Sequence, residues 1–141
     1  MSKKNLQQIW QRVPVHYYED GIKNNLFQRT WHSLKMKAFK KIVNHKQFDK
    51  ILDIGCAAGT LTNKISQILP QSCITGIDVY SDAIVFAKKK YPHIKFIKAN
   101  AHQLPFKSNF FDLIICYETI EHVYKPELVL AEIRRVLNKN G

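Results

Sequence analysis

Short apolar runs alternate with amphipathic stretches over the last two thirds of the chain. The runs are rich in isoleucine, leucine and phenylalanine, which is typical of buried strands. We expect strands at 50–54, 73–77, 94–98 and 112–117. In the stretches between and after them, apolar residues recur every three or four positions, as in helices that bury one face. We expect helices at 59–69, 81–90 and 126–138. This alternation predicts an α/β fold with a parallel sheet and helices on both faces.

A longer amphipathic stretch comes before this region. Apolar residues recur at helical spacing from about Ile22 to Val43, and most of the lysines lie away from that stripe. We expect one helix whose stripe packs on the core. The alternatives are a lid over the active site or a helix on a membrane surface. As a lid, the segment would offer aromatic and imidazole groups for substrate contact: Tyr17, Tyr18, Trp31 and His32.

The turn between the first strand and the next helix consists of small residues. The segment 51–62 reads Ile-Leu-Asp-Ile-Gly-Cys-Ala-Ala-Gly-Thr-Leu-Thr. Small residues let backbone N–H groups approach a ligand closely, and a helix N-terminus adds positive potential. The second strand ends in Gly76-Ile77-Asp78, and the Asp78 carboxylate can accept hydrogen bonds from both hydroxyls of a ribose. The pattern therefore predicts a site for a nucleoside-bearing cofactor.

The spacing of the small residues distinguishes between cofactors. A dinucleotide-binding turn needs glycine at its first, third and sixth positions, which here hold Gly55, Ala57 and Thr60. A P-loop needs Gly-Lys followed by Ser or Thr, which the sequence lacks. The Asp-x-Gly-x-x-x-Gly form of 53–59, followed by Asp78 at the end of the next strand, resembles motifs I and II of class I S-adenosylmethionine-dependent methyltransferases.

This resemblance covers roughly residues 48–141 and is closest to the type 11 and quinone-biosynthesis-like branch. It continues through Asn-Ala-His-Gln-Leu-Pro-Phe and Phe-Asp-Leu-Ile-Ile-Cys, and then through Glu-His-Val and Glu-Ile-Arg-Arg-Val-Leu; these segments lie at 100–106, 111–116, 121–123 and 132–137. It implies a Rossmann-like three-layer α/β/α sandwich with a parallel sheet.

The family's strand order is 3-2-1-4-5-7-6, and the chain offers strands for 3-2-1-4 alone. We therefore expect the N-terminal portion of the fold, from a fragment or a truncated product. It would comprise an N-terminal helical segment, 1–47, and an S-adenosylmethionine-binding core, 48–141, without the C-terminal strands. The fourth strand would lie at an open edge, which favours association with a partner.

The resemblance implies S-adenosyl-L-methionine as the cofactor. Asp53 would hold its amino-acid end, unless the carboxylate only caps the turn. Ala57 stands where the family often has glycine and adds one methyl group to the site. Asn100 stands where relatives often carry aspartate near the adenine amino group, and its amide oxygen can still accept that hydrogen bond. The expected cofactor contacts are Asp53, Gly55, Cys56, Ala57, Gly59, Asp78, Val79, Asn100, Ala101 and Glu118.

Methyl transfer from a sulfonium releases a neutral thioether, so positioning of the acceptor supplies most of the acceleration. The loop after the fourth strand should lie near the methyl group. His122 in this loop is the candidate general base toward a hydroxyl acceptor, and a structural histidine is the alternative. Glu118, Glu121 and His122 could together hold a metal, but the reaction needs none and we predict no metal site.

Composition and apolar run length limit the cellular location and the membrane attachment that the sequence allows. The 141 residues carry a formal net charge of +11 and three cysteines that are far apart. The cysteines predict reduced, buried thiols in a cytoplasmic protein. No apolar run reaches the length of a membrane span, and the N-terminus lacks the apolar stretch of a signal peptide.

The leading hypothesis is a methyltransferase that acts on a small or lipophilic acceptor. One alternative is a cofactor-binding module without catalysis. The other is a basic protein that binds nucleic acid or a membrane surface, although no alternation of aromatic and basic residues indicates RNA binding.

Overall fold

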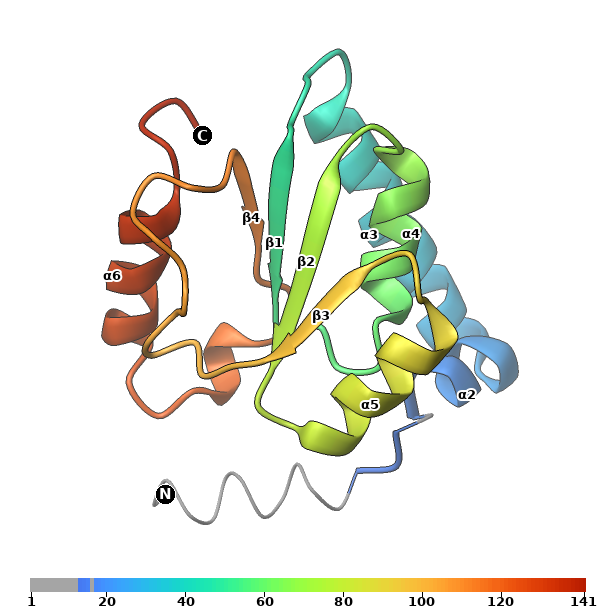
Figure 1. Ribbon diagram of the computed structural model, residues 1–141. Helices are drawn as coiled ribbons and strands as arrows, with labels where there is room; N and C mark the ends of the chain where they lie inside the picture. Colours follow the sequence, from blue (N-terminus) through green and yellow to red (C-terminus); the bar gives the residue numbers. More distant parts are fainter. Residues whose placement is uncertain (1–12, 16) are drawn as a thin grey trace.

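The computed structural model describes residues 13–15 and 17–141 and contains one parallel sheet. Its strands are β1 (Lys50–Ile54), β2 (Cys73–Asp78), β3 (Lys95–Lys98) and β4 (Leu113–Ile115). They lie in the order β3-β2-β1-β4, which is the order that the family resemblance implies. Three of the helices are α4 (Thr60–Ile68), α5 (Ser81–Lys90) and α6 (Pro126–Val136). Figure 1 shows α6 on one side of the sheet and α4 and α5 on the other, so the predicted three layers are present.

The central strand β1 explains why helices cover both faces. Its side chains alternate between the faces, as in any strand. Ile51 packs with Phe39 and Ile65 on the α4 side, whereas Leu52 packs with Val129 on the α6 side. Ile51 and Leu52 are both fully buried. A strand that is buried on both faces must be apolar throughout, and this is the pattern that made β1 recognisable in the sequence.

The N-terminal helical region is split in two, which corrects the prediction of one helix from Ile22 to Val43. Helix α2 spans Tyr17–Asn24 and helix α3 spans Leu26–Val43. Asn25 between them has an extended backbone, and its side chain accepts a hydrogen bond from the N–H of Gln28 at 3.1 Å. An asparagine that caps a new helix in this way ends the preceding one.

Most of the apolar stripe on α3 does not pack on the core, so that expectation is also wrong. The buried side chains of α3 are His32, Phe39 and Val43. Phe39 belongs to the predicted stripe, but its other large members are half or more exposed: Leu26, Phe27, Trp31, Leu34 and Ile42. Successive helical residues are rotated by about 100°, so Phe27 and Leu34 lie about 120° and 140° around the helix from Phe39.

Strand β4 lies at the edge of the sheet, as expected. The residues just before it pair with the chain that follows α6. The N–H groups of Phe110 and Phe111 both donate to the carbonyl of Val136, and the N–H of Asn138 donates to the carbonyl of Phe111. This pairing explains why α6 ends at Val136 rather than at the predicted residue 138. Among the described residues, no strand pairs with β4 on the side opposite β1.

The three cysteines are free, but their burial differs from the prediction. Cys56 is buried, Cys116 is half-buried and Cys73 is exposed at the start of β2. The cytoplasmic location inferred from them stays a prediction. In the described part of the chain, no helix combines the length and the apolar character needed to cross a membrane.

Candidate functional site

A cavity of about 590 Å³ lies at the carboxyl ends of β1 and β2. Its walls are the turn after β1, the end of β2, the segment after β3, the loop after β4, and residues 13–15 with Tyr17. In parallel α/β sheets this end of the strands is where ligands bind. The volume lies within the range of small-molecule sites, about 300–1,000 Å³.

The turn after β1 has the backbone that its two glycines predict. Gly55 and Gly59 have φ values of 77° and 76°, which residues with a side chain rarely adopt. A Cβ at Gly55 would lie 2.1 Å from Oγ1 of Thr119, and one at Gly59 would lie 2.6 Å from the ring of Phe96. Both positions therefore require glycine, for conformation and for space. Gly55 borders the cavity, and Gly59 directly precedes the first turn of α4.

Ala57 also has a left-handed backbone, with a φ of 44°. This conformation brings its Cβ close to the following carbonyl oxygen, so it is unfavourable for alanine. The N–H of Ala57 donates to Oδ2 of Asp78 at 2.9 Å. Ala57 borders the cavity, and its backbone is held by the carboxylate at the end of β2.

Asp78 borders the cavity, and its two oxygens are held by backbone groups. Oδ2 accepts from Ala57, and Oδ1 accepts from the N–H of Tyr80 at 2.9 Å. Burial raises the pKa of Asp78, and the hydrogen bonds from Tyr80 and Ala57 oppose that rise. A carboxylate can accept about four hydrogen bonds, so these oxygens keep capacity for a ligand hydroxyl.

Asp53 is fully buried and lies beside a second, smaller cavity of about 40 Å³. Its Oδ2 accepts a hydrogen bond from the hydroxyl of Thr62 at 2.7 Å, so a side chain on α4 holds it. Burial raises the pKa of Asp53 to about 6, although the bond from Thr62 opposes the rise. Gly55, Ala57 and Glu118 border both cavities and so form a shared wall. Asp53 borders the smaller cavity, and this wall separates it from the larger one.

Cys56 borders the smaller cavity rather than the larger one. Its side chain packs with Ile84, Ala87 and Phe96 in a cluster between α5 and the sheet. Burial raises the pKa of this thiol well above its ordinary value, so it stays protonated. These contacts suit a small packing residue, and Cys56, which was expected to contact the cofactor, does not border the larger cavity.

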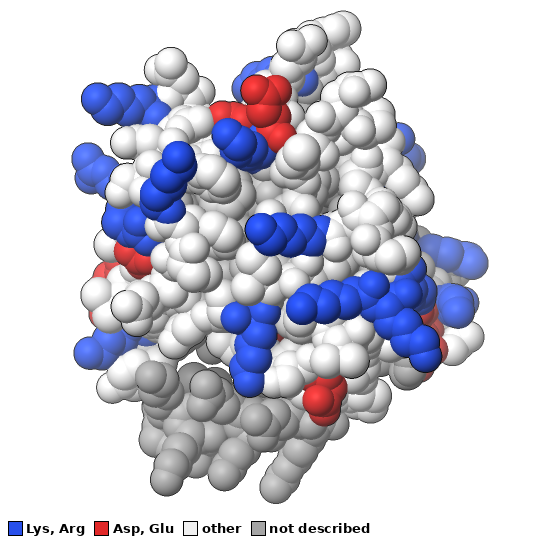
Figure 2. Space-filling model, viewed as in Figure 1, with Lys and Arg blue, Asp and Glu red and all other residues white. Residues whose placement is uncertain are grey.

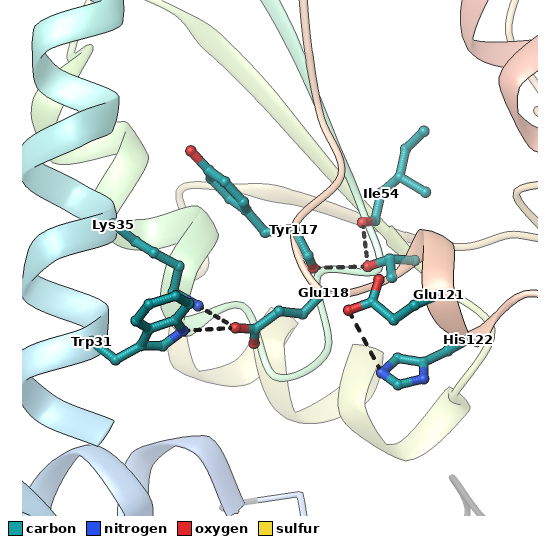
Figure 3. A network of polar contacts seen from close by, with 8 residues as sticks. Trp31, Lys35, Ile54, Tyr117, Glu118, Glu121 and His122 are labelled. Carbon is teal, nitrogen blue, oxygen red and sulfur yellow. Dashed lines mark hydrogen bonds and ion pairs between the residues drawn. The ribbon is translucent and has the colours of Figure 1, made fainter. Parts of the chain in front are cut away.

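Glu118 links the loop after β4 to the N-terminal region. Its Oε1 accepts hydrogen bonds from Nε1 of Trp31 at 3.1 Å and from Nζ of Lys35 at 2.7 Å, both on α3 (Figure 3). Glu118 has a φ of 51°, again in the left-handed region. The neighbouring hydroxyl of Thr119 lies 3.1 Å from the carbonyl oxygen of Ile54 and so holds the loop against the end of β1. The loop is therefore fixed from two sides.

His122 also borders the larger cavity. It ends a single 3-10 turn, Ile120–His122, and its Nε2 lies 3.9 Å from Oε1 of Glu121 (Figure 3). Within the described residues, no three histidine, cysteine or carboxylate side chains are grouped so that they could hold a metal ion.

The segment after β3 supplies another wall, with Asn100 and Ala101. Oδ1 of Asn100 accepts from the N–H of His102 at 3.0 Å and lies 2.9 Å from Nδ1 of the same residue. The amide oxygen that was predicted to meet the adenine amino group is therefore already shared with His102. Val79, which directly follows β2, also borders the cavity and is 43% exposed, so it can cover a ligand ring.

The four possible substrate contacts in the N-terminal region do not share one place in the structure. Tyr17 borders the larger cavity and His32 the smaller one, while Trp31 contacts Glu118 instead. The side chain of Tyr18 lies outside the described residues.

Several cavity residues were not predicted. Residues 13–15, Tyr80 and Tyr124 lie outside the motifs of the sequence, and His102 and Thr119 lie within them but were given no role.

Comparison with known proteins supports the same interpretation. A family model described as a methyltransferase domain matches residues 52–141. The demethylmenaquinone methyltransferase of Chlorobaculum tepidum is 23% identical over 141 residues, which cover 99% of this chain and 58% of that protein. The chain spans about half the length of the curated relatives it matches.

Two solved structures share the fold. The PH0226 protein from Pyrococcus horikoshii superimposes with a TM-score of 0.77 and 24% identity, over 94% of this chain and 58% of that one. The plantazolicin methyltransferase solved in complex with SAH superimposes with a TM-score of 0.68 and 20% identity, over 96% of this chain and 58% of that one. Since the family model covers well over half of the sequence, the chain belongs to the methyltransferase-domain family, the class I S-adenosylmethionine-dependent family that its motifs predict.

Proposed function

We propose that the chain binds S-adenosyl-L-methionine in the larger cavity and contributes that site to a methyltransferase for a small or lipophilic acceptor. The observation that carries the proposal is the joint placement of Asp78 and the turn 55–59. One carboxylate organises the turn and faces the cavity, at the strand ends where nucleoside ligands bind.

The donor and acceptor groups on the walls suit an adenosyl ligand. The Asp78 oxygens retain acceptor capacity for ribose hydroxyls. Val79 and Ala101 offer apolar surface to the adenine, and the oxygen of Asn100 lies on the same wall. The start of α4 at Thr60 directs its N-terminal N–H groups toward the turn, which favours a ligand carboxylate there. Asp53 would act across the shared wall, on the cationic amino group of the ligand.

When bound, the cofactor supplies an electrophilic methyl group. The work left to the chain is to orient the acceptor, which can contribute about 7–11 kcal/mol, and to accept its proton. His122 borders the cavity from the loop after β4 and is the candidate for that proton. Other residues that border the same cavity are apolar and suit a lipophilic ring: Val13, Pro14, Val15 and Val123. The demethylmenaquinone methyltransferase similarity favours a quinone-like acceptor.

Calorimetry with S-adenosylmethionine and S-adenosylhomocysteine tests the binding site. We expect wild type to bind both, and Asp78→Asn to weaken binding about tenfold or more, because an amide retains one acceptor oxygen for two backbone N–H groups and a ribose. Asp112→Asn is the matched control. Its carboxylate also accepts two backbone N–H groups, from Asp49 and Lys50, but lies outside the cavity walls. No heat with wild type, or equal affinity in Asp78→Asn, would overturn the proposal.

Turnover is a separate measurement. Accumulation of S-adenosylhomocysteine with a reduced quinone would support transfer to that acceptor. Binding with no turnover across quinone, phenol and amine acceptors would leave the chain as a cofactor-binding module.

The basic surface favours one other function, the binding of nucleic acid or of an anionic surface. Figure 2 shows lysine and arginine side chains spread over the visible face with few acidic ones among them, and the net charge is +11. Retention on heparin that falls steeply with salt would indicate nucleic-acid or anionic-surface binding. Elution at low salt would exclude it.

A further inference from the structure

Helix α2 carries one buried contact that none of the motifs accounts for. The carboxylate of Glu19 lies between the start of α4 and the end of α5, and its side chain is only 11% exposed. Its Oε1 accepts from the hydroxyl of Thr60 at 3.0 Å and from the hydroxyl of Tyr91 at 3.3 Å, and it forms an ion pair with Lys90. Three donors, from α4, from α5 and from the residue after α5, thus converge on one oxygen.

The neighbours of Glu19 in the chain border the larger cavity. Residues 13–15 and Tyr17 form one of its walls, and the N–H of Tyr17 donates to the carbonyl of Pro14 at 2.9 Å. Residues 13–15 together with α2 are called the lid below. Glu19 lies in the first turn of α2, within about one helical turn of the lid residues that border the cavity. Displacement of Glu19 would therefore move that wall.

The partners of Glu19 belong to the core of the protein rather than to the lid. Thr60 is the first residue of α4 and directly follows Gly59 of the cofactor turn. Lys90 ends α5, where a cation is favoured by the helix dipole, and its Nζ also lies 5.5 Å from the Tyr91 ring centroid. Burial alone would raise the pKa of Glu19, but the bonds from Lys90, Thr60 and Tyr91 lower it overall, so the carboxylate stays ionised at neutral pH.

We infer that Glu19 is a positioning residue that fastens the lid over the cofactor cavity and so controls how fast the cofactor product leaves. This inference rests on the proposed function for its ligand. Residues 13–15 and Tyr17 form one wall of the cavity that the cofactor would occupy, so movement of the lid would open a route for exchange. Opening breaks the contacts of Glu19 with Thr60, Lys90 and Tyr91 together. Release of the cofactor product is therefore slower than it would be without the contacts of Glu19.

The first test measures release of S-adenosylhomocysteine by rapid displacement with excess S-adenosylmethionine. We expect Glu19→Ala to release the product about three- to tenfold faster, a range that corresponds to the net contribution of about one ordinary hydrogen bond. Glu19→Gln should lie between Glu19→Ala and wild type, because its amide oxygen still accepts from Thr60. Asp20→Asn is the matched control, an exposed acid next to Glu19 on the same helix.

The lysine partner provides a second pair of variants. Lys90→Met should reproduce the faster release, whereas Lys89→Met, which removes an exposed neighbour, should not. The double variant Glu19→Ala/Lys90→Met should release no faster than the faster single variant, because both remove the same contact. A purely structural role would instead change the melting temperature and leave the release rate alone.

Hydrogen exchange of the α2 amides provides a readout that needs no ligand. We expect faster exchange over residues 17–24 in Glu19→Ala than in wild type or Asp20→Asn. Folded Glu19→Ala with unchanged exchange and unchanged release would overturn the inference. If wild type binds no S-adenosylhomocysteine, the proposed function fails, and the exchange of α2 alone then decides whether Glu19 fastens the lid.

Discussion

Oδ2 of Asp78 accepts the N–H of Ala57 at 2.9 Å, so the carboxylate at the end of β2 holds the turn that follows β1. The two motifs that suggested a cofactor site are therefore one physical unit. The carboxylate stabilises an unfavourable backbone conformation at Ala57 and presents its remaining acceptor capacity to the cavity. Changes at either residue should affect both the turn and the ligand.

Ala57→Gly should leave the free energy of unfolding within about 1 kcal/mol of wild type. Relief of the left-handed backbone, worth about 1–2 kcal/mol, is offset by the greater chain entropy of glycine in the unfolded state, about 0.5–1 kcal/mol. Ala58→Gly is the control, since Ala58 is buried without a positive φ. It should destabilise by about 1–2 kcal/mol, through the same entropy and a lost buried methyl group. Urea unfolding of both variants measures the difference, and equal losses would show that Ala57 is not strained.

Asp53→Asn should change how stability depends on pH. Burial raises the pKa of Asp53 from 3.8 to about 6, so the folded protein keeps a proton that the unfolded chain releases. This contribution is fully present below the unfolded pKa, and it is lost as pH rises through about 6. Relative to wild type, Asp53→Asn should therefore gain roughly 1–3 kcal/mol of unfolding free energy between pH 4.5 and 7.5.

Asp112→Asn is the control for the pH series. Hydrogen bonding, first from the N–H of Lys50, lowers the pKa of Asp112, so its titration lies below that range. Its difference from wild type should stay flat from pH 4.5 to 7.5. An equally flat difference for Asp53→Asn would mean that its carboxyl ionises normally in the folded protein.

Phe27→Ala and Phe39→Ala compare the same change on opposite faces of α3. Phe39 is 3% exposed in the core, and its truncation should cost about 3–5 kcal/mol of unfolding free energy. Phe27 is 78% exposed, and its truncation should cost no more than about 0.5 kcal/mol. Chemical unfolding at one pH measures both. A large loss at Phe27 would place the predicted stripe on the core after all.

His122→Gln tests the proposed general base. If His122 accepts the acceptor's proton, turnover should fall about 100-fold, while calorimetric affinity for S-adenosylhomocysteine stays within about twofold because His122 offers the adenosyl group no required contact. His93→Gln removes an exposed imidazole outside the cavity walls and should leave both quantities unchanged. Unchanged turnover in His122→Gln would leave His122 as a structural residue of the loop.

The sheet and the cofactor turn could be predicted because their determinants are local. Ile51 and Leu52 must be apolar wherever both faces of a strand are covered, and Gly55 and Gly59 are needed wherever the backbone is left-handed beside Thr119 and Phe96. The face of α3 could not be predicted. Its apolar stripe and its buried residues are both compatible with a helix, and only the position of the sheet selects Phe39 over Phe27.

The turn at 55–59 and the position of Asp78 at the end of β2 could be read from the sequence, because they depend on residue periodicity and backbone conformation, whereas the strand order came from the resemblance to a known family. Three features can be seen only in the folded structure: Asp53 faces a smaller cavity, Glu118 is held by α3, and Glu19 joins α2 to α4 and α5. Each of these is a side-chain contact between residues distant in the chain. Such a contact depends on how the layers pack, and a one-dimensional pattern does not record it.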